Sequence, residues 1–477
     1  MLYYSHMSEI LGDFFNAFGT LVTYLFKKDK ESPWRAYLFR ASAVGLLVYA
    51  FWLPDMFAQI FLISVAWARE LAPLWVPILL IFVFVPLWLR YVRAGFFEKT
   101  GYVLLEIKLP REIERSPKAM ELFFSGAVWA KGSVTYVDTF WDGKVGPWYS
   151  FEIASFGGDV HFFVWVWPKL RKIVETQIYA QYPTVEISEA PDYAARYPYG
   201  LEGRFMWGTH IKLAKPDPYP IKTYIDYGLD KEEEEEIKVD PITPTLEFLG
   251  GLKKGEQCWI QILAQAHQDR SWVHGHLFKR PDWKDEAKDL VNDILMRDPK
   301  TKSTRKESAT GFPIMPTLTE GEKEQANAIE RSLNKPAYEC MIRALYFAEG
   351  DAQSEIPKSI PALVGAFRQY SANDFNGFRL GWFTDLSDET KDVLWVTGLR
   401  EKMVAIFQKI YGKQMYDAYR RRSFFHYPYR FFHVNKPFIL TTEELATIYH
   451  FPGKVAATPT IGRAPSRKGE PPPNLPV

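Results

Sequence analysis

The feature that most constrains this chain is a long apolar stretch near its N-terminus, Leu71–Val92. The core of the stretch, Leu74–Leu89, contains no charged residue. A helix needs about 20 mainly apolar residues to cross the hydrocarbon core of a bilayer, and this stretch meets that length. Pro77 and Pro86 are compatible with a membrane helix, which tolerates proline near its ends. The stretch therefore predicts a transmembrane helix.

A second apolar segment, Ala41–Leu53, precedes this one. A helix over residues 36–54 is short but adequate for a span. If that helix continued to Ala68, Asp55 would lie inside the bilayer, at a cost of about 2.5–3.5 kcal/mol. The cheaper arrangement puts Asp55 at the interface and makes residues 55–70 an interfacial connection. One long tilted helix ending near Ala68 stays open as the weaker alternative.

The basic residues around the two segments predict their orientation. Arg35 and Arg40 precede the first segment and Arg90 and Arg93 follow the second, whereas the connection between them holds only Arg69. An excess of Lys and Arg marks the cytoplasmic flanks of membrane helices. We therefore expect a multi-pass protein of the inner (cytoplasmic) membrane, with both termini and the soluble domains in the cytoplasm.

Residues 1–35, ahead of the expected transmembrane hairpin over 36–95, allow two interpretations. Apolar side chains recur at near-helical spacing over Ile10–Phe26 and are followed by a lysine cluster. An amphipathic helix of this kind lies either on the inner face of the membrane or against the soluble part of the chain. A cleaved signal peptide ending at the A-x-A motif of Ala66–Ala68 is disfavoured, because the apolar region starts late and a full span follows.

The segment after the membrane region has the element order of a ferredoxin-like domain. Gly157 and Gly158 separate two apolar runs, which predicts a tight hairpin. The expected elements are a strand at 102–109, a helix at 117–129, strands at 148–155 and 160–166, an amphipathic helix at 169–181 and a strand at 184–188. This β-α-β-β-α-β order predicts a ferredoxin-like domain over residues 100–195.

Residues 203–452 predict a second α+β domain. The polar, proline-containing stretch 297–319 predicts a long loop within it. Strands are expected at 205–213, 257–265 and 337–347, and helices at 245–249, 282–296, 360–370 and 398–421. We expect a second ferredoxin-like unit with insertions and a long helix, followed by an extended Pro-rich tail over 453–477. The fold class is therefore α+β.

Charge and cysteine content exclude two broad classes. The chain has 58 basic and 57 acidic residues, so any polyanion-binding site has to be a local patch. Two cysteines, Cys258 and Cys340, cannot form a disulfide framework or a complete zinc site. This usage suits a reducing compartment.

The sequence predicts a non-enzymatic protein with no catalytic residue and no cofactor. Gly250–Gly255 has the glycine spacing of a phosphate loop, but Glu256 stands where the phosphate-binding lysine is required. We find no nucleophile elbow, zinc-protease helix or dinucleotide fingerprint. The charged run Lys231–Glu236 predicts a solvated loop or helix start rather than a docking site for a basic partner.

A histidine cluster is the one alternative that would make the protein an enzyme. His267, His274 and His276 lie close to Asp269 in the sequence. Two of them could share one face of a strand and bind a metal, but the spacing matches no strong ligand motif. We therefore predict solvated loop histidines and no metal site.

The segment Tyr416–Lys436 interleaves arginines with aromatic residues. Such a pattern is typical of surfaces that bind single-stranded nucleic acid or lipid headgroups. The candidate residues for binding nucleic acid or another partner are Arg420, Arg421, Arg422, Tyr427 and Arg430. The favoured alternative is structural: arginines at a helix C-terminus complement the helix dipole, and the aromatic rings pack in a core.

Three stretches of the soluble part carry a family resemblance. They are residues 102–124, residues 150–190 with their SFGGD turn, and residues 438–476 with ILTTEELATIYHFPG and the PPPNLP end. Together they resemble the membrane-anchored N-terminal region of coupling-type, DNA-translocating ATPases of type IV secretion systems. In that family the HFPG and Pro-rich elements precede a Walker A motor domain, and no Walker A motif is present here.

The resemblance implies an accessory or scaffold subunit of a type IV secretion-like translocation apparatus. Its expected partners are membrane lipids, a separately encoded coupling-type ATPase and other secretion subunits, and a homo-oligomer is compatible with the family. A membrane-tethered module that binds single-stranded nucleic acid stays open as the alternative.

Overall fold

The computed structural model describes residues 54–110, 115–128, 135–230, 239–267, 282–295, 318–384, 397–426 and 437–453. The chain divides into two compact units, Met1–Val92 and Arg93–Val477. Several predictions lie outside the described residues: the segment 1–35, nearly all of the first span with Arg35 and Arg40, the charged run at 231–236, and the tail beyond residue 453.

The first unit contains α3 (Pro54–Glu70) and the larger part of α4 (Ala72–Thr100), whose last residues belong to the second unit. The predicted interfacial connection 55–70 is helical, and Pro54 occupies the first helical position, where proline needs no hydrogen-bond partner for its nitrogen. Among the described residues, α4 is the helix that is long and apolar enough to cross a membrane, judged by length and composition. Arg90 and Arg93 lie towards its C-terminal end.

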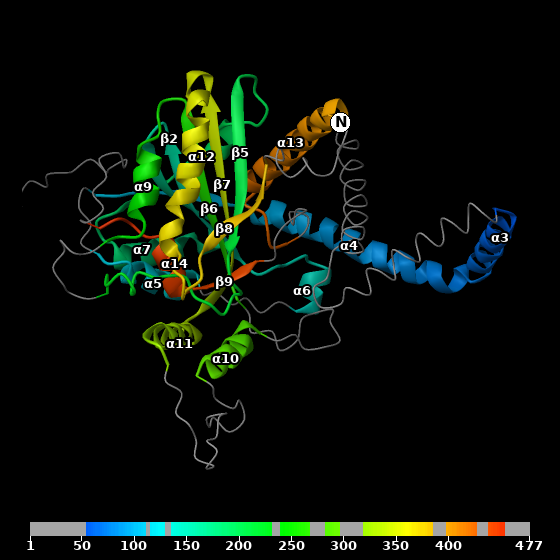
Figure 1. Ribbon diagram of the computed structural model, residues 1–477, viewed down its shortest axis with the longest axis horizontal. Coiled ribbons are helices and arrows are strands. Elements are labelled where there is room, and N and C mark those ends of the chain that lie inside the picture. The colour runs from blue at the N-terminus through cyan, green and yellow to red at the C-terminus, as the bar shows by residue number, and fades with distance from the viewer. Residues whose placement is uncertain are drawn as a thin grey trace, which may run out of the picture. The chain divides into compact units, whose positions relative to one another are not determined.

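The second unit is built on one 9-stranded sheet in which all neighbouring strands are antiparallel (Figure 1). The strand order is β4-β1-β3-β2-β6-β7-β5-β8, and β9 pairs with β7. The strands are β1 (Val103–Lys108), β2 (Trp148–Phe156), β3 (Asp159–Val166), β4 (Glu186–Glu189), β5 (Arg204–Leu213), β6 (Glu256–Ala266), β7 (Ala337–Glu349), β8 (Phe378–Phe383) and β9 (Phe438–Thr441). The predicted α+β class is confirmed.

The first half of the sheet runs β1, α5 (Lys118–Phe123), β2, β3, α7 (Arg171–Gln181) and β4. A π-helical turn, Phe124–Val128, extends α5. Gly157 and Gly158 form the predicted β2–β3 turn with φ angles of +64° and +95°, which L side chains rarely adopt. This half places its strands in the order β4-β1-β3-β2.

The second half repeats the strand and helix order of the first half: β5, α9 (Thr243–Gly250), β6, β7, α12 (Ile356–Ala366) and β8. Two helices, α10 (Trp283–Ile294) and α11 (Glu320–Leu333), are inserted between β6 and β7 and pack together. Strand β2 pairs with β6 from Trp148 opposite Gln265 to Phe156 opposite Gln257. The two predicted domains therefore share one continuous sheet.

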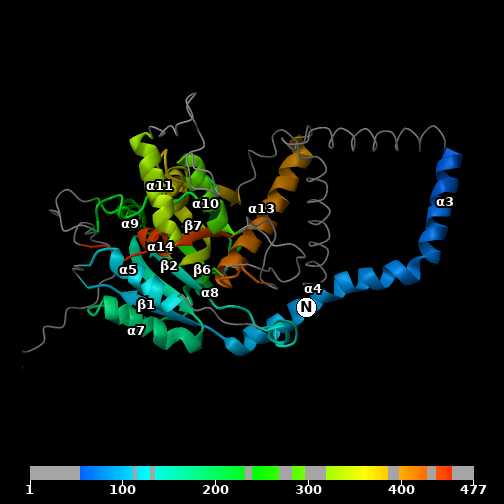
Figure 2. The same ribbon diagram turned by 90° about the horizontal axis from the view of Figure 1, so that it is seen from below.

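Helices cover both faces of this sheet (Figure 2). On one face α5, α7, α9, α12 and the short α14 (Thr442–Ile448) pack over a core that includes Phe151 and Ile260. On the other face α13 (Thr397–Arg420) and α8 (Tyr193–Arg196) pack over Trp259 and Leu345. Because both faces are covered, β6 and β7 are buried along nearly their whole length and do not alternate between apolar and polar residues.

Most expected elements are present to within a few residues, including the β2–β3 hairpin and the long helix α13. The sequence reading missed α6 (Tyr136–Phe140), α8, α11, β8, β9 and α14. Most of the expected loop at 297–319 lies outside the described residues.

Candidate functional site

The last turns of α4 join the sheet through two phenylalanine side chains. The ring of Phe96 lies 5.7 Å from that of Trp167, and the ring of Phe97 lies 5.4 Å from that of Trp148. Trp148 also stacks on Trp165 at a centroid distance of 5.6 Å. The helix that carries the apolar stretch therefore ends within an aromatic cluster of the folded unit.

The same face of the sheet holds the C-terminal half of α13. Tyr416 and Tyr419 are buried there, and the Tyr419 ring lies 5.6 Å from the fully buried ring of Trp259. Tyr416 Oη donates a hydrogen bond of 2.6 Å to Ala194 O, which ties α13 to α8. The predicted packing of aromatic residues from Tyr416 onward is confirmed for the residues up to Phe424, which is also buried.

Helix α13 ends in a Schellman motif with arginine at the left-handed position. The N–H of Arg422 bonds Tyr419 O at 3.0 Å, and the N–H of Ser423 bonds Ala418 O at 3.1 Å. Arg422 has a φ of +49°, at a position that glycine usually occupies. A left-handed L-residue costs about 1–2 kcal/mol, so other contacts have to hold Arg422 in place.

Those contacts are with two carboxylates, the fully buried Glu152 and the partly buried Asp192. Arg422 Nε lies 2.9 Å from Glu152 Oε1, and Arg422 Nη1 lies 2.5 Å from Asp192 Oδ2. The second terminal nitrogen, Nη2, also donates to both acids, at 3.1 Å to Glu152 and 3.0 Å to Asp192. Arg422 thus joins the end of α13 to β2 and to the residue that caps α8.

Glu152 lies at the centre of this network and is fully buried. It accepts hydrogen bonds from Ser150 Oγ at 2.6 Å, Tyr193 Oη at 2.7 Å and Gln261 Nε2 at 2.9 Å. Burial alone would raise the pKa of Glu152, but the Arg422 charge and the hydrogen bonds from Arg422, Ser150 and Tyr193 outweigh it and hold the pKa below its ordinary value. Glu152 is therefore the counter-ion of Arg422.

A second buried arginine, Arg343 on β7, has fewer partners. Its Nη2 donates to Ser423 O at 2.6 Å, while its Nε and Nη1 have no hydrogen-bond partner among the described residues. Burial lowers the pKa of Arg343 to about 9. Gln261 is its neighbour on β6, and Gln261 Oε1 is likewise without a partner in the described part of the chain.

The structure divides the predicted arginine patch. Arg420 and Arg421 are exposed, and Arg420 lies 4.0 Å from Asp417. For the candidate residue Arg422 the structure agrees with the favoured structural alternative, because its guanidinium is buried and paired with Glu152 and Asp192. Tyr427 and Arg430 lie outside the described residues, so their part of the prediction stays a prediction.

Of the histidine cluster, only His267 lies in the described part of the chain. Its Nε2 lies 2.9 Å from Asp282 Oδ1 and its Nδ1 lies 3.3 Å from Glu339 Oε1, so it is buried between two carboxylates rather than solvated. Within the described residues no group of His, Cys, Asp and Glu side chains has the arrangement of a metal site. His274 and His276 lie outside them.

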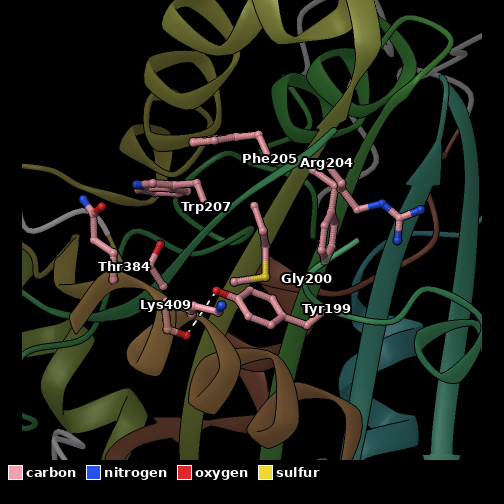
Figure 3. Close-up of a pocket in the computed structure, with 11 residues that line it drawn as sticks. Tyr199, Gly200, Arg204, Phe205, Trp207, Thr384 and Lys409 are labelled. Carbon is pink, nitrogen blue, oxygen red and sulfur yellow. Dashed lines mark hydrogen bonds between the residues drawn. The ribbon is translucent and has the colours of Figure 1, made fainter. Parts of the chain in front are cut away.

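A cavity with a volume of about 290 Å³ lies between the start of β5 and α13 (Figure 3). Its aromatic lining residues are Tyr199, Phe205, Trp207 and Phe347, and its polar ones include Arg204, Thr384 and Lys409. Tyr199 Oη donates to Lys409 O at 3.2 Å, which fixes the tyrosine against α13. Sequence reasoning missed this site because its residues come from four distant segments.

Most of the second unit matches the model of a known protein family. Residues 130–464 match the family described as "Domain of unknown function (DUF8128)". No curated protein matches the chain. The match spans more than half of the 477 residues, from before β2 to beyond α14. The chain therefore belongs to the DUF8128 family.

Proposed function

We propose that this protein is a non-enzymatic, membrane-anchored scaffold or accessory component of a type IV secretion-like translocation apparatus, working beside a separate motor ATPase. The observation that carries the proposal is that α4 begins as an exposed apolar helix and ends packed against the sheet. Its apolar side chains, Leu74, Ile81 and Leu87 among them, are exposed, and its last turns hold Phe96 and Phe97 against the tryptophans of the sheet. A single helix thus connects an apolar segment to a folded body.

The physical support for a membrane anchor is the cost of leaving this helix in water. Contiguous apolar patches of such extent are rare on soluble proteins, and a bilayer removes them from water. Arg90 and Arg93 follow the apolar stretch and favour a cytoplasmic location for the sheet. A multi-pass arrangement in the inner membrane, with the second unit in the cytoplasm, is therefore part of the proposal.

We further propose that each half of the sheet is a ferredoxin-like unit. In each half the strands lie in the order fourth, first, third, second, and the two connecting helices cover the same face. The halves meet through equivalent strands, because β2 and β6 are the second strands of their respective halves. Antiparallel pairing of these equivalent edges relates the halves by an approximate two-fold axis.

The proposal is tested by purifying the tagged full-length protein from its native membranes and identifying its partners by mass spectrometry. Recovery of a Walker A ATPase of the coupling type, with other secretion subunits, is expected. A tagged membrane protein of unrelated function, purified in parallel from the same membranes, controls for nonspecific capture. Absence of any such motor, under conditions in which it is expressed, would contradict the proposal.

A further inference from the structure

The short helix α6 carries an exposed apolar face. Four apolar side chains lie within about 140° of its circumference, at 100° per residue: Tyr136, Val137, Phe140 and Trp141. No residue of α6, all of which the structure describes, is buried, and Tyr136, Val137 and Trp141 expose 64%, 63% and 67% of their surface. Single exposed apolar residues are common on soluble proteins, whereas a group on one helical face marks a contact surface. This face of α6 is therefore a candidate interaction surface.

Local hydrogen bonds hold the face of α6 in place. Thr135 and Asp138 form a capping box at the start of the helix. The Trp141 N–H bonds Val137 O at 2.9 Å, and the Lys144 N–H bonds Asp138 O at 2.9 Å. The apolar side chains thus belong to a folded turn of the chain, which orders them before any partner is present.

The end of the sheet that receives α4 also receives α6. The Gln265 side-chain amide donates to Gly146 O at 2.9 Å, between α6 and the start of β2 at Trp148. The Trp148 ring in turn lies 5.4 Å from the ring of Phe97, in the last turns of α4. Figure 1 shows α6 on the side of the sheet where α13 lies, and Phe97 packs against the core on that side. Both segments therefore join the sheet at the N-terminal end of β2.

The apolar stretch of α4 ends close to this point along the chain. Phe97 follows Leu89, the last residue of the uncharged stretch, by eight residues of one helix, or about 12 Å at 1.5 Å per residue. Any tilt of α4 shortens the height that these residues span. Each headgroup region is about 5–8 Å thick, so with Leu89 at the edge of the hydrocarbon core, Phe97 lies within about 7 Å of the headgroups. This gap is smaller than the diameter of a helix with its side chains, about 10 Å.

The charges around α6 indicate the kind of surface that it fits. Residues 135–147 contain two acids and one base. The base, Lys144, places its Nζ 2.5 Å from Asp138 Oδ1 and 3.1 Å from Asp142 Oδ2. The segment thus has no excess of positive charge to attract a polyanion or an anionic lipid. Tyrosine and tryptophan instead favour the boundary between headgroups and acyl chains, where the ring is in apolar and the polar atom in hydrated surroundings.

We propose that α6 is a second membrane contact of the folded unit, in which Tyr136, Val137 and Trp141 insert into the interface of a zwitterionic bilayer. The inference rests on the proposed membrane anchor and deepens it. Attachment through α4 alone leaves the unit free to turn about the axis of one helix. With α6 in the interface as well, the unit is held at two points and keeps one side turned towards the bilayer.

The test places a fluorescent label beside the inserting rings. Full-length Val137→Cys is labelled with NBD and reconstituted into phosphatidylcholine nanodiscs that carry a nitroxide either near the headgroup or deep in the acyl chain. The native Cys258 and Cys340 are fully buried, so the label goes to the introduced cysteine. We expect stronger quenching by the shallow nitroxide than by the deep one, as for a helix about 5–10 Å deep in the interface. Lys254→Cys, exposed beside the Gly157 turn at the opposite end of β2, is the matched position and should not be quenched.

Substitutions in the Val137→Cys background test whether the rings hold the label in the lipid. Tyr136→Ser combined with Trp141→Ser should reduce quenching to the level seen at position 254. Trp141→Phe keeps an apolar ring and should retain most of the quenching. Leu122→Ser, at a similarly exposed apolar residue of α5, is the matched control and should change nothing. Because the replaced residues are exposed, these variants leave the core intact.

Four outcomes would overturn the proposal. Equal quenching at positions 137 and 254 would show that α6 stays in water. Quenching only in bilayers with phosphatidylglycerol would assign the contact to charge. Protection of the label at 137 from aqueous iodide, without quenching by lipid nitroxides, would identify a protein surface, such as a second copy, as the occupant. Failure of the protein to enter nanodiscs would remove the anchor and this inference together, whereas failure to recover a motor in the purification experiment would leave these results unaffected.

Discussion

The most consequential single residue is Arg422, a buried charge in a left-handed backbone position. Replacing it with methionine would leave Glu152 buried without its counter-ion. We expect Arg422→Met to lower the free energy of unfolding by about 3–5 kcal/mol, as measured by urea denaturation in detergent. Arg420→Met, two residues earlier and exposed, is the matched control and should change it by no more than about 0.5 kcal/mol.

The coupling between the two buried charges gives an independent check. In the double variant E152Q/R422M neither member of the Glu152–Arg422 ion pair is left charged without the other, so the loss should be clearly smaller than the sum of the two single losses. Loss of stability that is simply additive would show that Arg422 acts through its backbone position and not through Glu152.

Glu444 gives a prediction on pH. Burial raises the pKa of Glu444 to about 7, despite hydrogen bonds from Thr441 N at 2.8 Å and Ile221 N at 3.0 Å. Between the ordinary glutamate value of 4.5 and about 7 the folded state holds a proton that the unfolded state has lost, so stability falls as pH rises. We expect Glu444→Gln to flatten the decrease of melting temperature from pH 5 to 8, and to recover about 2–3 kcal/mol at pH 8.

The control for this prediction is the same capping motif on α11. Thr319 and Glu322 form an exposed capping box, and hydrogen bonds from Thr319 lower the pKa of Glu322 instead of raising it. Glu322→Gln should therefore leave the slope between pH 5 and 8 unchanged. Burial raises the pKa of Asp217 to about 6, so Asp217 still contributes part of the pH dependence of stability in both variants. A wild-type slope that Glu444→Gln does not reduce would assign the whole effect to other groups.

At the scale of elements, the β2–β3 turn makes a specific demand for glycine. A Cβ on Gly158 would lie 2.8 Å from Leu252 O and 2.9 Å from Gly250 O, and the φ of +95° is unfavourable for alanine. Both contacts are with backbone atoms that cannot rotate away. We expect Gly158→Ala to destabilise the protein by about 2 kcal/mol or more in urea denaturation.

Gly365, near the end of α12, is the matched control because a Cβ there would meet nothing within 4 Å. Alanine is a better helix former than glycine, so Gly365→Ala should be neutral or stabilise by up to about 1 kcal/mol. Equal effects of the two substitutions would contradict the steric argument for Gly158.

Elements with a local signal could be predicted, and elements whose stability comes from distant contacts could not. The glycine pair predicted the β2–β3 hairpin, and helical spacing predicted α7. Strands β8 and β9 are short and lack a clear period, and β9 is fixed by pairing with β7, some 100 residues away in the sequence. Likewise, the local sequence around the three consecutive arginines does not show which of them forms the ion pair with Glu152, 270 residues earlier.

At the scale of the whole molecule, the joining of the two halves is the feature that local patterns could not predict. The sequence reading separated residues 100–195 from 203–452, because each has its own run of elements. Pairing of β2 with β6 buries two edge strands that would otherwise expose unpaired backbone groups. Which edge strand pairs with β2 depends on the shape and register of the folded halves. No local pattern in a single sequence indicates this pairing.

The proposed topology of the whole chain can be tested with single cysteines. Cys258 and Cys340 are both fully buried, so they give little background for a membrane-impermeant maleimide. Gln59 on α3 and Lys254 before β6 are exposed. If residues 55–70 form the connection outside the membrane and the sheet lies inside, Gln59→Cys is labelled in intact cells and Lys254→Cys only after permeabilisation.

The two possible failures of this labelling pattern have different physical meanings. Labelling of Lys254→Cys in intact cells would place the sheet outside and contradict the orientation inferred from Arg90 and Arg93. If Gln59→Cys stays unlabelled in both conditions, α3 is buried in the bilayer as part of one long tilted helix, with Asp55 inside the membrane. That arrangement would have to offset the cost of about 2.5–3.5 kcal/mol for a central aspartate through the apolar residues of α3. Labelling of Gln59→Cys therefore decides between a short first span and a long one.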